Sequence, residues 1–180
     1  MSPLTVAVTG TRAVPDATPK AVQAALADHL GPFCAQDTTW LLGGAAGIDT
    51  LALTWLADQS ARGRIVVAVP VTVAAQPAAA AAAIRAAEVA GRLDELVELN
   101  HPDGLGAAAY TARNRWLVDR ADVVVGFPLT PTDDGSGTWE TLRYARAGRR
   151  PVVVAALSDC SGQNVSHPAK QADPRGPNHA

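Results

Sequence analysis

The chain has 180 residues, of which 48% are hydrophobic and 18% charged, so it has enough apolar material for a core and too little charge for a disordered chain. Its net charge of -2 argues against a protein whose main task is wrapping duplex DNA, although a local basic patch remains compatible with that charge. No apolar stretch approaches the roughly 20 residues that span a bilayer, and the apolar run at the N-terminus lacks the basic segment of a signal peptide. We therefore expect a cytoplasmic protein with no membrane partner.

Short apolar runs alternate with longer helical patterns along most of the chain. The apolar runs predict six strands, at 4–8, 39–42, 65–69, 95–99, 122–126 and 151–155. The helical patterns between them cover 18–30, 48–59, 77–90, 107–119 and 139–147. Gly31 and Pro32 are expected to end the first helix, and Pro77 suits the first turn of the third.

Continuous apolar strands are typical of a parallel sheet that is covered by helices on both faces. The alternation with helices therefore predicts an α/β fold, with a doubly wound, mostly parallel six-stranded sheet in one domain over 1–157. Residues 158–180 are polar and lack periodicity, which predicts a disordered tail. Cys34 and Cys160 lie far apart without ligand spacing, so no metal site is expected.

Glycine-rich turns follow three of the predicted strands. In a parallel sheet the carboxyl ends of the strands form the ligand crevice, and amides at helix starts favour anions such as phosphate. These turns predict a phosphate-binding or nucleotide-binding site, although tight turns also need glycine for backbone reasons alone. The candidate ligand-binding residues are Gly10, Thr11 and Arg12, then Gly43, Gly44, Ala45 and Asp49, and finally Gly135, Ser136, Gly137 and Thr138.

Arg113 and Arg115 flank an asparagine in a predicted helix and lie about 200° apart around its axis. We expect Arg113 to face the ligand, while Arg115 is structural or lies at the rim; a solvated helix face is the alternative. Glu140 fits either a capping role, if Gly137 or Thr138 caps the helix, or a role as a general base or ribose ligand. Trp139 is expected in the core or in the crevice wall, and it is the tryptophan best placed to stack on a base.

The segments VAVTGTR, GGAAGIDTLAL, ARNRWLVDRADVVVGF and GSGTWETLRYARAGRRPVVV together resemble the SLOG superfamily. This superfamily of Rossmann-like domains includes the DNA-processing protein A family and the cytokinin-activating phosphoribohydrolases. The resemblance covers about residues 4–155 and implies a Rossmann-like fold that binds a nucleotide or nucleotide-derived ligand. Where the phosphoribohydrolases carry their final glutamate, this chain has Thr141, and Glu140 stands one residue early.

Three functions follow from these observations. The first is a stand-alone binding protein for a nucleotide-like ligand, such as AMP or ADP-ribose, with no other cofactor expected. The second is a nucleoside 5′-monophosphate phosphoribohydrolase, in which Arg113 and Glu140 are the catalytic residues. The third, ranked last, is a single-stranded DNA-binding protein of the DNA-processing type, which would use Arg12, Arg113 and Arg115. The resemblance also leaves a homo-oligomer open.

Overall fold

All six apolar runs form strands of one parallel sheet, and all five helical patterns form helices. The computed structural model describes residues 3–14, 19–34, 37–59 and 63–157, so the predicted tail over 158–180 lies outside the described residues. The strands are β1 (Leu4–Gly10), β2 (Thr38–Leu42), β3 (Arg64–Val69), β4 (Glu95–Glu98), β5 (Val123–Phe127) and β6 (Val152–Val154). The helices are α1 (Pro19–Cys34), α2 (Ile48–Asp58), α3 (Ala78–Val89), α4 (Ala107–Arg120) and α5 (Gly137–Ala147), with a short 3-10 helix at Val73–Ala75.

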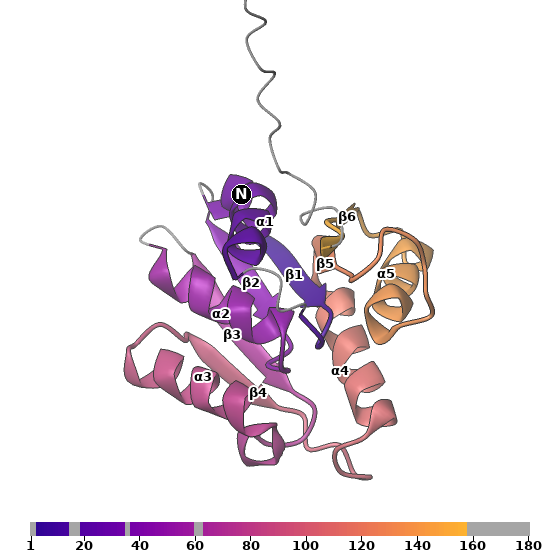
Figure 1. The fold of residues 1–180 in the computed structure, drawn as a ribbon. Coiled ribbons are helices and arrows are strands. Elements are labelled where there is room, and N and C mark those ends of the chain that lie inside the picture. The colour runs from indigo at the N-terminus through magenta and orange to yellow at the C-terminus, as the bar shows by residue number, and fades with distance from the viewer. Residues whose placement is uncertain (1–2, 15–18, 35–36, 60–62, 158–180) are drawn as a thin grey trace, which may run out of the picture.

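The strand order is β4-β3-β2-β1-β5-β6, and all pairs are parallel. The chain first winds outward from β1 through β2 and β3 to β4, and then returns to the other side of β1 for β5 and β6 (Figure 1). The order therefore reverses between β1 and β5. In doubly wound sheets such a reversal opens a crevice at the carboxyl ends of the two strands.

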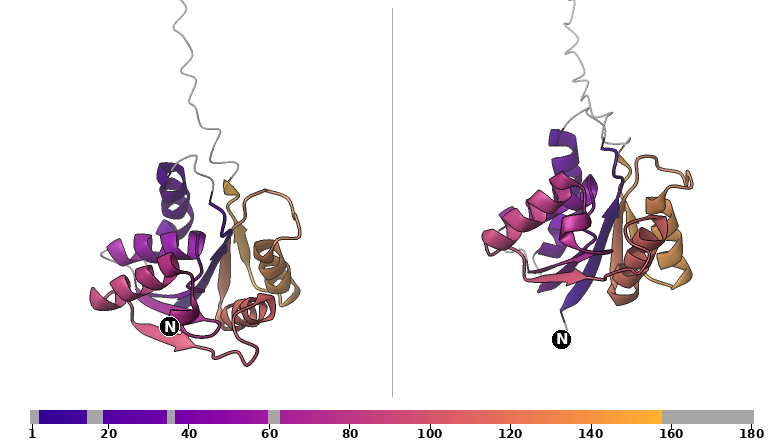
Figure 2. Two further views of the ribbon diagram at one scale, coloured as in Figure 1. Left: turned by 60° about the horizontal axis from the view of Figure 1, so that its bottom comes forward. Right: turned by 90° about the horizontal axis from the view of Figure 1, so that it is seen from below.

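Helices cover both faces of the sheet, as the two views in Figure 2 show. One face packs against α1, α2 and α3 through a core that includes Leu26, Leu56 and Ile84. The other face packs against α4 and α5, where Leu117, Trp139 and Leu142 are buried. This is the predicted α/β fold of the Rossmann-like type, with its six-stranded sheet.

The helix boundaries at the two prolines differ from the prediction, and α5 begins at Gly137, two residues earlier than expected. Helix α1 continues through Gly31 and Pro32 to Cys34, because Phe33 and Cys34 pack against the core and the Phe33 carbonyl accepts a hydrogen bond from Thr38 Oγ1. These contacts outweigh the helix-breaking tendency of the Gly-Pro pair. Pro77 is the N-cap of α3 and lies just before its first turn.

Candidate functional site

A cavity of about 270 Å³ lies at the point where the strand order reverses. The end of β1 and its turn, the start of α2, one side of α4 and the start of α5 all contribute to it. Its lining residues are Thr9, Gly10, Thr11, Arg12, Ala13, Ala45, Asp49, Tyr110, Arg113, Asn114, Ser136, Gly137 and Thr138. The structure thus brings residues from all three glycine-rich turns to one cavity, together with Arg113. We call it the main cavity.

The turn after β1 is tied to its neighbours through its backbone. The Thr11 amide donates to the Phe127 carbonyl at 3.0 Å, and the Thr11 carbonyl accepts from the Ile48 amide at 3.1 Å. A Cβ on Gly10 would lie 2.5 Å from Ile48, so glycine is needed here for the close approach of α2. These contacts hold the exposed Arg12 at the cavity, where its guanidinium lies 4.7 Å from the centre of the Tyr110 ring.

The turn after β2 differs from the expectation of an open phosphate cradle. Gly43 and Gly44 are buried and do not line the main cavity, and a Cβ on Gly43 would lie 1.6 Å from Arg113 Nη1. The Ala45 amide, expected to face phosphate, donates instead to Asp49 Oδ2 at 3.2 Å. The side chains of Asp49 and Arg113 therefore occupy this turn, and Gly43 is needed for the close approach of Arg113.

Asp49 and Arg113 form a buried ion pair at one wall of the main cavity. Arg113 Nη1 lies 3.3 Å from Asp49 Oδ2, and the side chains are only 5% and 7% exposed, respectively. Burial raises the pKa of Asp49 above its ordinary value, while the charge of Arg113 and the Ala45 amide act in the opposite direction. Burial also lowers the pKa of Arg113, although a guanidinium stays protonated in proteins.

The turn after β5 presents the start of α5 to the main cavity. Ser136 is the N-cap and accepts from the Trp139 amide, so the cap is neither Gly137 nor Thr138. The first-turn amides of Gly137 and Thr138 have no acceptor among the described residues. A Cβ on Gly137 would meet nothing within 4 Å, which leaves its backbone open to a ligand.

Two aspartates hold the turn that precedes α5. Asp133 accepts from Arg143 and from the Gly135 amide, and Asp134 accepts from the Ser136 amide. These hydrogen bonds lower the pKa of both carboxyls. Both aspartates therefore stabilise the turn through hydrogen bonds to its backbone.

Asn114 links helix α4 to helix α5. Its Oδ1 accepts from Arg113 Nε at 2.9 Å, and its Nδ2 donates to Thr141 Oγ1 at 2.8 Å. Thr141 in turn donates to the Gly137 carbonyl at 2.8 Å. Asn114 and Tyr110 also line the main cavity, although the sequence analysis did not predict them as site residues. Both lie close to Arg113 in the sequence, at one and three positions from it, and this proximity could have indicated them.

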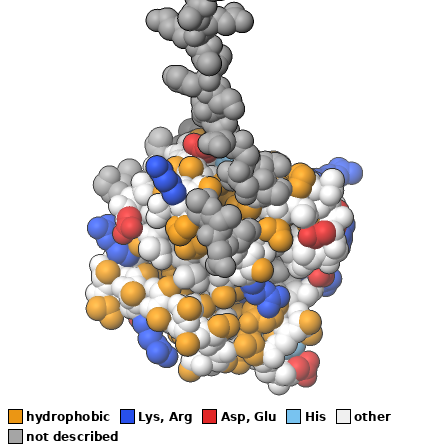
Figure 3. Space-filling view, in the orientation of Figure 1, with side chains coloured by type: hydrophobic (Ala, Val, Ile, Leu, Met, Phe, Trp, Pro, Cys, Tyr) orange, Lys and Arg blue, Asp and Glu red, His pale blue; other side chains and the backbone are white. Residues whose placement is uncertain are grey.

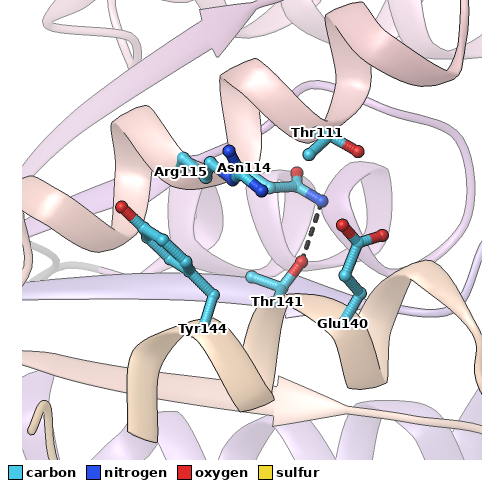
Figure 4. Close-up of a pocket in the computed structure, with 6 residues that line it drawn as sticks. All are labelled: Thr111, Asn114, Arg115, Glu140, Thr141 and Tyr144. Atoms are coloured by element: carbon cyan, nitrogen blue, oxygen red, sulfur yellow. Dashed lines mark hydrogen bonds between the residues drawn. The ribbon is translucent and has the colours of Figure 1, made fainter. Parts of the chain in front are cut away.

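The two predicted catalytic residues do not line the same cavity. Arg113 lies in the wall of the main cavity, whereas Glu140 is exposed and lines a smaller pocket between α4 and α5 (Figure 4). Thr141 stands where the phosphoribohydrolases carry their final glutamate; it is buried and accepts a hydrogen bond from Asn114. This separation leaves Arg113 facing the main cavity without a carboxylate from Glu140.

Arg115 and Trp139 also take definite places in the structure. Arg115 is exposed and lies 5.3 Å from the centre of the Tyr144 ring, in the smaller pocket and outside the main cavity. Trp139 is only 4% exposed, and its Nε1 donates to the Thr130 carbonyl. The interpretation of Trp139 as a base-stacking residue is therefore wrong, because the indole packs in the core between α5 and the sheet.

The described residues hold neither a metal-binding cluster nor a membrane-spanning helix. In these parts of the chain, no group of three or more His, Cys, Asp or Glu side chains comes together as a metal ion would require. None of the described helices combines the length and apolar character that crossing a bilayer needs.

Comparison with known proteins connects this fold to a solved structure. No protein-family model and no curated protein sequence matches the chain. A structure of DNA processing protein A from Helicobacter pylori, reported for its mode of binding single-stranded DNA, is similar with 24% identity and a TM-score of 0.64. The match covers 84% of this chain but only 65% of the other protein. The chain therefore has the Rossmann-like fold of DNA processing protein A.

Proposed function

We propose that the main cavity binds the phosphate of a nucleotide or nucleotide-derived small molecule. The observation that carries this proposal is the convergence of Arg12 with the open amides at the start of α5. Helix N-termini carry about half a positive charge and present free amide donors, which suits a phosphate group. Arginine adds a planar pair of donors that matches phosphate oxygens.

The charge of the main cavity suits a small anion. Its charged lining side chains are Arg12, Arg113 and Asp49, so two positive charges and one negative charge leave a net +1. A single phosphate balances this charge together with the start of α5, whereas a chain of several phosphates would need more cations. The cavity volume of about 270 Å³ lies just below the range of about 300–1,000 Å³ that is usual for small-molecule sites, which suits a small ligand.

The position of Glu140 favours binding over hydrolysis of a glycosidic bond. A general base must come within hydrogen-bond reach of the attacking water, and Glu140 lines the neighbouring pocket rather than the main cavity. We therefore expect no release of free base from AMP, and equal lack of release from the Glu140→Ala variant.

Thermal unfolding with inorganic phosphate, AMP and ADP-ribose tests the proposal. A ligand at about 100 times its Kd stabilises the folded state by about 2.7 kcal/mol, which raises the Tm. Arg12→Gln should weaken binding by about tenfold or more, because it removes a charge-assisted hydrogen bond. Arg85→Gln, at an exposed position on α3, is the matched control and should bind like the original protein. Absence of any Tm shift with all three ligands at millimolar concentration would overturn the proposal.

Single-stranded DNA binding is the second candidate, because the similar solved structure is of a protein that binds it. On the face shown in Figure 3, outside the part covered by grey atoms, lysine and arginine side chains stand apart and form no continuous basic strip. Binding to several phosphates gives a salt dependence with a slope of about −0.7 per phosphate. A steep slope with labelled oligothymidylate would favour this candidate, whereas a slope near that of one phosphate favours a nucleotide ligand.

A further inference from the structure

Asp49 introduces a negative charge into the wall of a cavity that is otherwise positive. It lines the main cavity together with Arg12 and Gly137, although its side chain is only 7% exposed. Both hydrogen bonds to its carboxylate, from the Ala45 amide and from Arg113, end on Oδ2. Among the described residues Oδ1 has no donor, so this oxygen retains its capacity to accept hydrogen bonds from a ligand.

The chemistry of a carboxylate restricts which part of a ligand can lie beside it. An ionised carboxylate only accepts hydrogen bonds, and it repels the oxygens of a phosphate. The phosphate therefore belongs at Arg12 and the start of α5, while the ligand group at Asp49 must donate hydrogen bonds. In a 5′-nucleotide the donors nearest to the phosphate are the ribose hydroxyls, and the amino groups of the bases lie farther along the molecule.

We propose that the Asp49 carboxylate accepts hydrogen bonds from the ribose hydroxyls of the ligand, so that the main cavity selects ribonucleotides over nucleotides that lack these hydroxyls. This inference rests on the proposed function, because it requires the phosphate of the same ligand to lie at Arg12. Arg113 acts here as a positioning residue, because it donates to Oδ2 and leaves Oδ1 available to the ligand. The selection disfavours DNA, which lacks the 2′-hydroxyl.

Calorimetric titration of the full chain with matched nucleotides tests the inference. The four common 5′-ribonucleotides are each compared with the 2′,3′-dideoxy nucleotide of the same base, and inorganic phosphate is titrated alongside. Loss of the hydroxyls leaves Oδ1 of this buried carboxylate without a donor when the ligand is bound, so we expect binding to weaken about tenfold to a hundredfold for each base that binds. Titration with the 2′-deoxy nucleotides, which lack only the 2′-hydroxyl, then shows whether the 2′-hydroxyl or the 3′-hydroxyl donates to Asp49.

Asp49→Ala should remove the preference for the ribonucleotide. The ratio of the two affinities is the measurement, because a freed Arg113 adds attraction for phosphate and changes both affinities together. Asp58→Asn removes an exposed aspartate from the other end of α2 and should keep the original ratio. If Asp49→Ala fails to fold, the comparison of ribonucleotides with dideoxy nucleotides in the unsubstituted protein still tests whether the cavity selects ribonucleotides.

The outcomes separate this inference from the proposed function. Equal binding of ribonucleotides and dideoxy nucleotides overturns the role of Asp49 but leaves phosphate binding in place. A preference that follows the amino groups of the bases and ignores the hydroxyls overturns it as well. If neither nucleotides nor phosphate bind, the proposed function fails and the inference fails with it.

Discussion

The sequence predicted that Arg113 faces the crevice, but it could not predict that Asp49 is the ion-pair partner of Arg113. Residues 113 and 115 face about 200° apart on a helix, so only one of the two arginines can reach the crevice. The structure buries Arg113 in the cavity wall and leaves Arg115 exposed. Its partner Asp49 lies 64 residues away, on α2, and no local pattern links the two positions. The pair forms because α2 and α4 meet at the cavity from opposite faces of the sheet.

Removal of Arg113 should destabilise the protein more strongly as pH rises. Arg113→Met leaves Asp49 buried without its cation, which costs about 3–5 kcal/mol near neutral pH. Burial raises the pKa of Asp49 above its unfolded value of about 3.9, and loss of Arg113 raises it further. The folded variant therefore binds more protons than the unfolded chain above about pH 4, and its free energy of unfolding falls with pH until the folded pKa is passed.

Urea denaturation of the original protein and Arg113→Met between about pH 5 and 8 measures this effect. The difference in free energy of unfolding should widen as pH increases. Arg115→Met, at the exposed position two residues along the same helix, should change it by less than about 0.5 kcal/mol. A difference that stays constant with pH would contradict the coupling of Arg113 to Asp49.

Gly43→Ala should disturb the same pair by a steric route. Its Cβ would lie 1.6 Å from Arg113 Nη1 and 2.6 Å from Asp49 Oδ2, so the buried guanidinium must move. Overpacking of this kind costs about 1–3 kcal/mol, measurable by denaturant unfolding. Gly31→Ala, where an added Cβ meets nothing within 4 Å, should cause no loss of stability. Equal free energies of unfolding for the two variants would show that the Asp49–Arg113 pair can shift without loss of stability.

At the scale of elements, side-chain hydrogen bonds join α4 to the first turn of α5 beside the cavity. Asn114 joins Arg113 to Thr141, and Thr141 joins Asn114 to the first turn of α5. These hydrogen bonds connect the cation at the cavity wall to the amides that the proposal assigns to phosphate. The sequence indicated both helices from their periodicity, but the connection depends on how they pack side by side.

Asn114→Ala should therefore loosen the contact between α4 and α5. It removes the acceptor of Arg113 Nε and the donor to Thr141, and unsatisfied buried groups cost about 1–3 kcal/mol. A double-mutant cycle with Thr141→Val, read by denaturant unfolding, should give a coupling energy of about 0.5–3 kcal/mol. Strictly additive effects of the two substitutions would mean that the hydrogen bond contributes nothing to the packing of α5.

At the scale of the whole molecule, three residues after β6 are buried at the end of the described chain. Ala155, Ala156 and Leu157 are at most 5% exposed. The Ala155 amide donates to the Gly126 carbonyl and the Leu157 amide to the Pro128 carbonyl. Side chains after the last strand thus pack in the core beside β5, and we predict that the domain extends at least to residue 157 and ends near it.

Truncation at two points tests this boundary. A chain that ends at residue 154 loses the buried Leu157 and two backbone hydrogen bonds, and should be destabilised by about 2–4 kcal/mol. A chain that ends at residue 157 should unfold at the same denaturant concentration as the full chain. A large loss of stability in the chain that ends at residue 157 would place the boundary of the domain farther along the chain.

The sequence by itself determined the elements, the α/β class and the position of the glycine-rich turns, because apolar periodicity and turn residues act over a few neighbouring positions. The helical period also predicted that only one of Arg113 and Arg115 can face the crevice. Only the tertiary structure decided that α1 passes through Pro32, that Asp49 and Arg113 occupy the turn after β2, that Trp139 is buried and that Glu140 lies in a separate pocket. Each of these depends on contacts between segments far apart in the chain, and such contacts are set by the packing of whole helices on the sheet.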